Sequence, residues 1–426
     1  MIAEKSITAQ TVMDALSGRA NKVNFIQDAE LTSAIRFLEA NGIPTARHED
    51  YKYCNVDAVL RKEFKSLLQE FTDVTPEQLK PYKLDEAINL VVLNGQYNEN
   101  LSDKLIVKGI SIKALDAFSG NKNTPVASLA KSEQDAFIAI SNAFSNNGIF
   151  LKIEKGNAIP MPIQIIYVNS ANTEAFVNPR SFIHLEANSE LTLTERFVNL
   201  SAQKVFSNFL SEKLVEENAK LTSYTIQEEG QLGYSVNTNQ VQVNRYANYD
   251  NTTITLSGQL VRNNHNVVLA EENCQAHLNG LFYTNYSQLV DNHTLMDHRV
   301  ANCESNELYK GLVNGKSTGV FNGKIYVRKD AQKTNAYQSS KNILLSDDAT
   351  INTKPQLEIY ANDVKCSHGT STGKIDENAM FYLKARGIGE ESARKLLLHA
   401  FAQEVVDKVE IGSLKSYTEN YLNQLY

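Results

Sequence analysis

The chain has 426 residues and a mildly acidic composition, with a formal net charge of -7 and no tryptophan. It contains no dominant block of basic residues, which argues against nucleic acid as its main partner, and no apolar run long enough to span a bilayer. Its four cysteines are far apart and form no disulfide framework, and the N-terminus lacks the apolar core of a signal peptide. We therefore expect a cytoplasmic protein of two or three domains with a large buried core.

The apolar residues within residues 1–88 recur at helical spacing, so we predict an N-terminal helical domain there. Leu31 and Leu38 fit the apolar face of an amphipathic helix that ends at Gly42. The segment that follows, PTARHEDYKY at residues 44–53, begins with a proline that blocks continuation of the helix. Packing within a helical cap is the simplest role for its aromatic side chains.

Near residue 89 the pattern changes to β structure. A short apolar run at residues 88–93 stops at an Asn-Gly turn signal. A helix is expected over residues 134–145, and after it the strand-like pattern continues almost without interruption to Tyr360. We therefore predict a mainly β core over residues 89–360.

A dipeptide recurs through this core, in which a turn-forming or aromatic residue precedes a small one. The copies are 27 to 31 residues apart and lie at Asn157-Ala158, Asn188-Ser189, Asn218-Ala219, Tyr246-Ala247, Asn273-Cys274, Asn302-Cys303 and Asp330-Ala331. Regular spacing of this length favours stacked coils in which the small residue fits a tight corner. A βαβ sheet would require a helix between successive strands, but few helical patterns interrupt the strands here. A sandwich would show turns about every 8–12 residues. We predict a parallel β-helix whose open ends are covered by the flanking helical segments.

Residues 361–426 are predicted to form a C-terminal helical domain that begins with a loop. The loop, KCSHG, carries two side chains able to bind a metal, Cys366 and His368. A helix with an aspartate at its N-cap is expected over residues 376–386, and a second helix over residues 390–409. The apolar stripe of the second helix is wide enough to face both its own domain and a partner.

Two groups of residues are candidate metal ligands. Cys366 and His368 can face one iron or cluster, but a structural metal normally needs four ligands, so either a partner supplies the others or the two residues are structural. The second group has enough ligands for zinc and consists of Cys274, His277, His293, His298 and Cys303. Because Cys274 and His277 would point to opposite faces of a strand, we favour buried thiols that act as small apolar groups.

The sequence contains no phosphate-binding GxxxxGK[ST] loop, no HExxH motif and no dinucleotide-binding glycine pattern. Adjacent acidic residues leave open a β-helix enzyme that cleaves polysaccharide, a lyase or a hydrolase, with a carboxylate site. These pairs are Glu216-Glu217, Glu271-Glu272 and Asp347-Asp348. Neighbouring residues on a strand point to opposite faces, so solvated corners are the favoured interpretation.

Three segments carry a family resemblance. The segment SNELYKGLVNGKSTGVFN at residues 305–322 and the C-terminal run KPQLEIYANDVKCSHGTSTGKIDENAMFYLKARGI resemble the SufB/SufD family of iron–sulfur cluster assembly proteins. PTARHEDYKY resembles an element near the start of the SufD branch, with Tyr51 in place of the usual tryptophan. The first cysteine, Cys54, stands alone, without the N-terminal cysteine cluster of the SufB branch, so the SufD branch is the better match.

The resemblance implies a right-handed parallel β-helix between helical termini. It also implies a non-catalytic scaffold subunit of a SufB–SufC–SufD complex, which builds iron–sulfur clusters and passes them on. In the family, the β-helix pairs with SufB and the C-terminal helices bind the ATPase SufC. His368 matches a family histidine at a site for iron or a nascent cluster at the SufB contact, and Cys366 matches a neighbouring cysteine.

The resemblance further implies that the chain alone holds no tightly bound cofactor. Where SufB is missing, a homodimer is the alternative assembly. The surface that faces SufC would lie on the two C-terminal helices, and its expected members are Met380, Tyr382, Arg386, Leu397 and Phe401.

Overall fold

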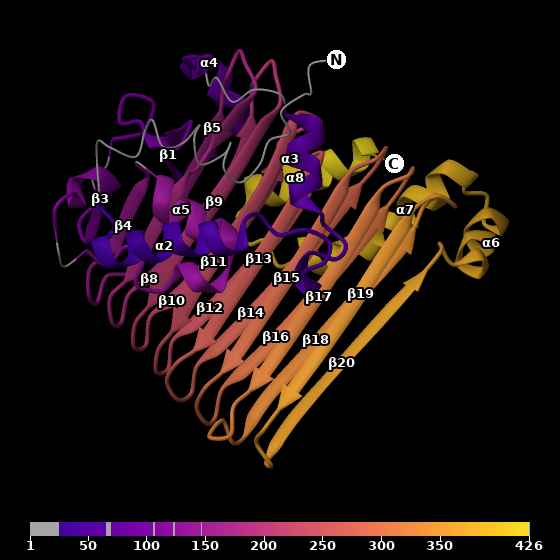
Figure 1. Ribbon diagram of the computed structural model, residues 1–426. Helices are drawn as coiled ribbons and strands as arrows, with labels where there is room; N and C mark the ends of the chain where they lie inside the picture. Colours follow the sequence, from indigo (N-terminus) through magenta and orange to yellow (C-terminus); the bar gives the residue numbers. More distant parts are fainter. Residues whose placement is uncertain (1–24, 65–69, 105–106, 122–123, 146, 426) are drawn as a thin grey trace.

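The computed structural model describes residues 25–425, apart from residues 65–69, 105–106, 122–123 and 146. In this part of the chain, two sheets of ten strands each face one another as a parallel β-helix (Figure 1). Helices precede the β-helix in the sequence and follow it. The predicted mainly β architecture is confirmed.

Strands that are neighbours in a sheet come from successive coils. In spatial order the first sheet contains β2 (Gln96–Tyr97), β1 (Ile88–Leu93), β5 (Ile163–Asn169), β8 (Glu190–Asn199), β10 (Lys220–Glu228), β12 (Asn248–Ser257), β14 (Gln275–Thr284), β16 (Glu304–Val313), β18 (Thr334–Leu344) and β20 (Val364–Gly373). The second sheet contains β19 (Thr350–Ile359), β17 (Thr318–Val327), β15 (Leu289–His298), β13 (Leu260–Leu269), β11 (Gly233–Val243), β9 (Val205–Val215), β7 (Arg180–Leu185), β4 (Ile149–Ile153) and β3 (Ile110–Ala114), with β6 (Ala175–Val177) beside β9. The strands pair in parallel, except that β2 and β3 pair antiparallel with β1 and β4.

Most coils turn from the second sheet to the first at a residue with left-handed backbone. These corner residues have φ between 56° and 63° and are Asn188, Asn218, Tyr246, Asn273 and Asn302. Asparagine tolerates this conformation better than most residues, and the small residue that follows each corner is buried. The predicted repeat is therefore confirmed at these five corners. At the first and last copies the left-handed residue is instead Gly156 and Lys333.

The space between the two sheets is apolar along most of its length. One buried cluster extends from Leu90 on β1 to Ala336 on β18 and includes Ile163, Leu221 and Ile325. Burial of one such aliphatic side chain contributes about 1.5–3 kcal/mol. This cluster is the main favourable contribution to the stability of the β-helix.

N-terminal helices cover part of the outer face of the second sheet. The elements before and within the first coils are α2 (Asp28–Asn41), η1 (Glu49–Tyr51), α3 (Val56–Glu63), α4 (Pro76–Leu79), η2 (Lys80–Tyr82), η3 (Leu115–Phe118), η4 (Ser132–Gln134) and α5 (Ala136–Phe144). α2, α3 and α5 share an apolar cluster with side chains of β6, β9, β11 and β13, and α2 lies beside α5 in Figure 1. Gly42, with φ 64°, ends α2 as predicted. Residues 1–24 of the predicted helical domain lie outside the described residues.

The C-terminal helices follow β20, and the last two of them pack on the outer face of the first sheet. They are α6 (Glu377–Ala385), α7 (Glu390–Val406) and α8 (Gly412–Leu425). Val405 and Leu414 join a buried cluster with Ile254 and Leu281 of the first sheet. As predicted, α6 begins with an aspartate cap, because Asp376 accepts the backbone N–H groups of the first turn. Of the helices in the described ranges, none is long and apolar enough to cross a membrane.

The segment KCSHG is part of a strand, so the prediction of a loop is wrong. β20 pairs with β18 in parallel over its whole length. Its run of Ser, Gly and Thr lacks the alternation of apolar and polar residues that marks a half-buried strand, and pairing with β18 supplies the order that local sequence does not. The regular β structure consequently continues past the boundary expected at residue 360.

Candidate functional site

The last strand places Cys366 and His368 on the same face, directed toward the interior. In the strand register Cys366 pairs with Ala336 and His368 with Gln338, and both partners on β18 are buried. Ser367 between them points to the opposite face, because side chains alternate along a strand. The structure therefore brings together the two residues that the sequence analysis singled out.

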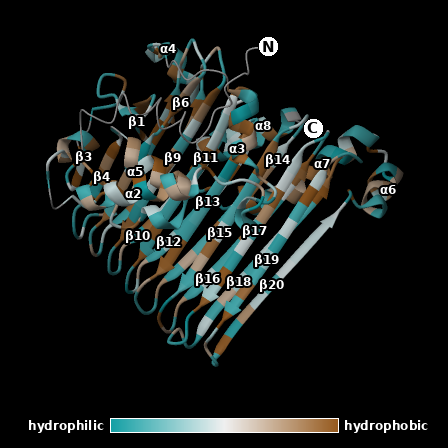
Figure 2. Ribbon diagram, viewed as in Figure 1, coloured by the Kyte–Doolittle hydropathy of each residue, from teal (hydrophilic) through white to brown (hydrophobic). Residues whose placement is uncertain are grey.

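The β-helix ends at β19 and β20, and no strand in the described residues pairs beyond them. Each is ten residues long, so each leaves a full edge of backbone N–H and C=O groups without a strand partner. The side chains of β20 are mostly exposed, and the strand is pale in Figure 2, between hydrophilic and hydrophobic. A long and weakly charged edge of this kind is a template for pairing with another chain.

The two candidate ligands differ in their surroundings. Cys366 is half-buried against the interior apolar cluster, and burial raises the pKa of its thiol, so it is protonated at neutral pH unless a metal replaces the proton. His368 is exposed. Within the ranges that the structure describes, no group of three or more His, Cys, Asp and Glu side chains is placed to hold a metal ion. This site offers at most two protein ligands, and a complete metal site would need others from outside the chain.

The alternative zinc ligands do not converge. Cys274 and Cys303 are fully buried at the corners of successive coils, as the interpretation as small apolar groups predicted. His277 points outward from β14, where it contacts an aspartate of β12. His293 contacts an aspartate of the second sheet, whereas His298 is buried in the interior beside a serine. These residues therefore form no common site.

Apolar side chains on α6 and α7 face solvent. Phe381 is 74% exposed, Tyr382 57% and Leu396 52%. A hollow of about 430 Å³ lies between α6, α7 and the corner after β18, and Met380 lines it. Exposed aromatic side chains beside a hollow are typical of a surface that binds another protein.

The five residues expected on the partner surface have different environments. Tyr382 and Arg386 are exposed and stack on each other, with the guanidinium 5.2 Å from the ring centroid. Met380 and Leu397 are partly exposed. Phe401 departs from the expectation, because its ring packs against its own β-helix, 4.6 Å from the ammonium group of a lysine on β16.

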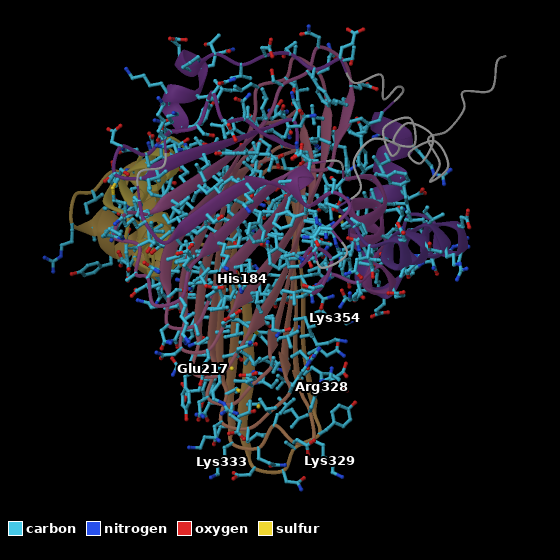
Figure 3. The ribbon with its side chains drawn as sticks, turned by 90° about the vertical axis from the view of Figure 1, so that its left-hand side faces the viewer. His184, Glu217, Arg328, Lys329, Lys333 and Lys354 are labelled. Atoms are coloured by element: carbon cyan, nitrogen blue, oxygen red, sulfur yellow. The ribbon has the colours of Figure 1, made fainter. Side chains whose placement is uncertain are left out.

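The acidic pairs lie at corners of the coils, as predicted. The exposed members are Glu217, Glu271, Glu272, Asp347 and Asp348. Glu216 instead accepts a hydrogen bond from His184 at 2.7 Å. Figure 3 shows Glu217 at the margin of the β-helix, with Lys329 and Lys333 at its lower end. The pairs therefore form solvated corners.

Two strings in the sequence match the GxSxG pattern of serine hydrolases, Gly315–Gly319 and Gly369–Gly373. In those enzymes the serine lies on a sharp turn between a strand and a helix. Here Ser317 is buried at the corner before β17, where it contacts Thr284 at 2.8 Å, and Ser371 lies within the extended strand β20. Neither serine has the geometry of a nucleophile.

Two family models match this chain. The model described as "SUF system FeS cluster assembly, SufBD core domain" matches residues 167–401, and "SufBD protein N-terminal region" matches residues 19–165. The chain belongs to the SufB/SufD family. Membership in this family of iron–sulfur cluster assembly proteins confirms the resemblance, and the polysaccharide-cleaving alternative gains no support from it.

Named relatives within the SufB/SufD family match over most of the chain. The "Iron-sulfur cluster assembly protein SufD" of Escherichia coli (strain K12) is 29% identical over 382 residues, covering 89% of this chain and 88% of the relative. An "Iron-sulfur cluster assembly SufBD family protein" of Synechocystis sp. is 26% identical over 388 residues, covering 88% and 85%. The protein named SufD in Bacillus subtilis (strain 168) is 26% identical over 293 residues, covering 67% and 65%.

Sequence reasoning missed several residues that the fold places at these sites. Phe381 and Leu396 are the most exposed apolar side chains of α6 and α7, and only the packing of the helices shows which apolar face is left over. Glu307 and Gln338 lie behind His368 in the interior of the β-helix. The alternation of the strand around Glu307 was the available signal, because it places this carboxyl on the inward face.

Proposed function

We propose that this protein is a non-catalytic scaffold subunit for iron–sulfur cluster assembly, with the role of SufD. The observation that carries the proposal is the uncovered end of the β-helix, where His368 and Cys366 face inward from an unpaired edge strand. Two ligands cannot complete a metal site, but they can contribute to one that forms between two chains. Iron or a nascent cluster would be the cargo of this site, and the chain alone holds no tightly bound cofactor.

The partner at this end would be SufB. β20 has free backbone groups along one edge, and an extended strand of SufB could add to the sheet there and supply the remaining ligands. A homodimer through the same edge is the alternative where SufB is missing. All four cysteines are free thiols, which suits the reducing cytoplasm where we place this complex.

The ATPase SufC would bind the exposed face of α6 and α7, formed by Met380, Phe381, Tyr382, Arg386 and Leu396. Only a short connection separates the end of β20 at Gly373 from the start of α6 at Glu377. A movement of α6 is therefore transmitted directly to the strand that carries His368. We infer that ATP-driven dimerisation of SufC moves these helices and opens the SufB contact.

The test is co-purification of the tagged full chain with SufB and SufC, together with growth of cells that depend on this pathway. The full chain should retain both partners, and truncation after Gly373 should lose SufC. His368→Ala should abolish cluster assembly while both partners are retained. His277→Ala, which changes an outward histidine of the same sheet, serves as the matched control. Intact assembly with His368→Ala would refute the role of the site.

A further inference from the structure

His368 is the last of a column of three polar residues that are paired across neighbouring strands of the first sheet, on the face directed toward the interior. In the strand register Glu307 of β16 pairs with Gln338 of β18, which in turn pairs with His368. Glu307 and Gln338 are 0% and 3% exposed, whereas the same column on β14 holds Leu278. Paired residues on neighbouring strands lie about 4.8 Å apart, so each side chain is within reach of the next.

The two buried members of this column have oxygen atoms without a partner. Gln338 Nε2 donates to Glu307 Oε2, which also accepts from the Thr294 hydroxyl at 3.0 Å. Glu307 Oε1 and Gln338 Oε1 have no hydrogen-bond partner among the described residues. An unpaired buried polar atom costs about 1–3 kcal/mol, a cost that leucine avoids one coil earlier. These two positions therefore carry a cost in stability that an apolar side chain would not.

The orientation of the Gln338 amide follows from its neighbours. Because Nε2 is committed to the Glu307 carboxyl, the free end of the amide is Oε1, which can only accept a hydrogen bond. On β17, a Cβ atom added at Gly323 would lie 2.2 Å from Gln338 Nε2, so glycine leaves the room that the amide occupies. The acceptor is thus held in place before any ligand arrives.

We propose that Gln338 is a positioning residue for His368, with its Oε1 accepting one ring N–H of the imidazole. The other ring nitrogen is then available at the open end of the β-helix. Histidines that bind metals generally donate their second N–H to such an acceptor, which fixes the tautomer and the direction of the ring. The inference rests on the proposed function for what His368 binds, but the hydrogen bond needs only a rotation of the His368 side chain toward Gln338 Oε1, which has no partner in the described chain.

The experiment measures the ratio of the two neutral tautomers of His368 in the full chain. Nitrogen-labelled histidine gives separate ring signals by NMR at a pH where the imidazole is neutral, and His368→Ala identifies the signals of His368. Gln338→Leu removes the acceptor and keeps the interior filled. One neutral hydrogen bond corresponds to about a fivefold change in such a ratio, and this is the change we expect.

Two further variants make the result specific. Gly323→Ala displaces the amide without removing a polar atom, so it should shift the ratio in the same direction. Gln356→Leu is the matched control, because Gln356 on β19 alternates with the inward residues and donates to Glu358 at 2.6 Å. It should leave the ratio unchanged.

An unchanged tautomer ratio in folded Gln338→Leu overturns the proposal. If Gln338→Leu does not fold, an unchanged ratio in Gly323→Ala overturns it instead. The outcome is separate from that of the proposed function. A shifted ratio together with normal cluster assembly in His368→Ala would keep the positioning contact and refute the role of the site. An unchanged ratio in Gln338→Leu together with lost cluster assembly in His368→Ala would refute the positioning contact and support the role of the site.

Discussion

The two ends of the β-helix are built differently. At the N-terminal end the sheets finish with β2, of two residues, and β3, of five residues, and both strands run antiparallel to their neighbours. At the C-terminal end they finish with two strands of ten residues each. Short and irregular edge strands protect a sheet from pairing with other chains, whereas long regular ones invite it. The edges at the first end are therefore protected against strand pairing, whereas those at the second end are long enough to pair with a further strand.

Two buried carboxyl groups, Glu212 near the first end and Glu307 near the second, also differ in their partners. Beneath α5, Glu212 accepts hydrogen bonds from the Arg180 guanidinium and from three backbone N–H groups of residues 127–130. Near the open end, Glu307 and Gln338 each keep an oxygen without a partner in the described chain. Both oxygens of the Glu212 carboxylate therefore have partners within the chain, whereas the Glu307 carboxyl keeps one oxygen without a partner.

The largest effect on folding is expected at Glu212, near the first end. Glu212→Ala leaves the fully buried Arg180 without its carboxylate, and loss of one partner of a buried ion pair costs about 3–5 kcal/mol. Urea denaturation followed by circular dichroism measures this loss. Asp348→Ala, which removes the exposed partner of Lys316, is the control and should change the free energy of unfolding little. Equal effects of the two variants would contradict the contrast.

Glu307 should make stability depend on pH. Burial raises the pKa of this carboxyl from 4.5 to about 7, so the folded state binds more protons than the unfolded state between these values. Stability therefore falls as pH rises through this window, by up to about 3 kcal/mol. Glu307→Gln should be more stable than the wild type above pH 7 and equal to it below pH 4.5. Thermal unfolding at pH 4 and pH 8 tests the sign, and a constant difference would refute it.

A smaller loss is expected where the N-terminal segment contacts the N-cap residue of α5. The Tyr51 hydroxyl donates to Asp135 at 2.6 Å, and burial raises the pKa of that carboxyl. Tyr51→Phe keeps the ring and leaves a buried acceptor without this donor, which costs about 1–3 kcal/mol. Tyr53→Phe changes an exposed ring two residues away and serves as the reference in the same denaturation experiment. Identical midpoints for the two variants would show that the contact contributes nothing.

The smallest effect on folding is expected on the open edge, where the effect on binding should be large. Ser371→Lys places a charge on β20, and a lysine on an edge strand opposes pairing with another chain. The free energy of unfolding should change by no more than about 0.5 kcal/mol, because the position is exposed. Capture of SufB should be lost, whereas Gln275→Lys at an exposed position of an inner strand should retain it. Normal capture by Ser371→Lys would place the SufB contact elsewhere.

The sequence by itself determined the coiled architecture, because the physical cause of the repeat is local. A left-handed corner needs asparagine or a similar residue, and the stacked coil needs a small side chain after it, so both leave a mark every 27 to 31 residues. Helix limits such as Gly42 and the cap of α6 were predictable for the same reason. The family resemblance was also carried by contiguous segments.

Only the tertiary structure decided what the end of the β-helix looks like. β20 owes its extended form to pairing with β18, and its own serines, threonines and glycines do not specify a strand. The partners of His368 in the interior lie 30 and 61 residues earlier in the chain, at Gln338 and Glu307, and strand register alone makes them neighbours. Which apolar side chains of α6 and α7 remain exposed depends on how these helices pack, because burial is a property of the assembled chain and not of a single segment.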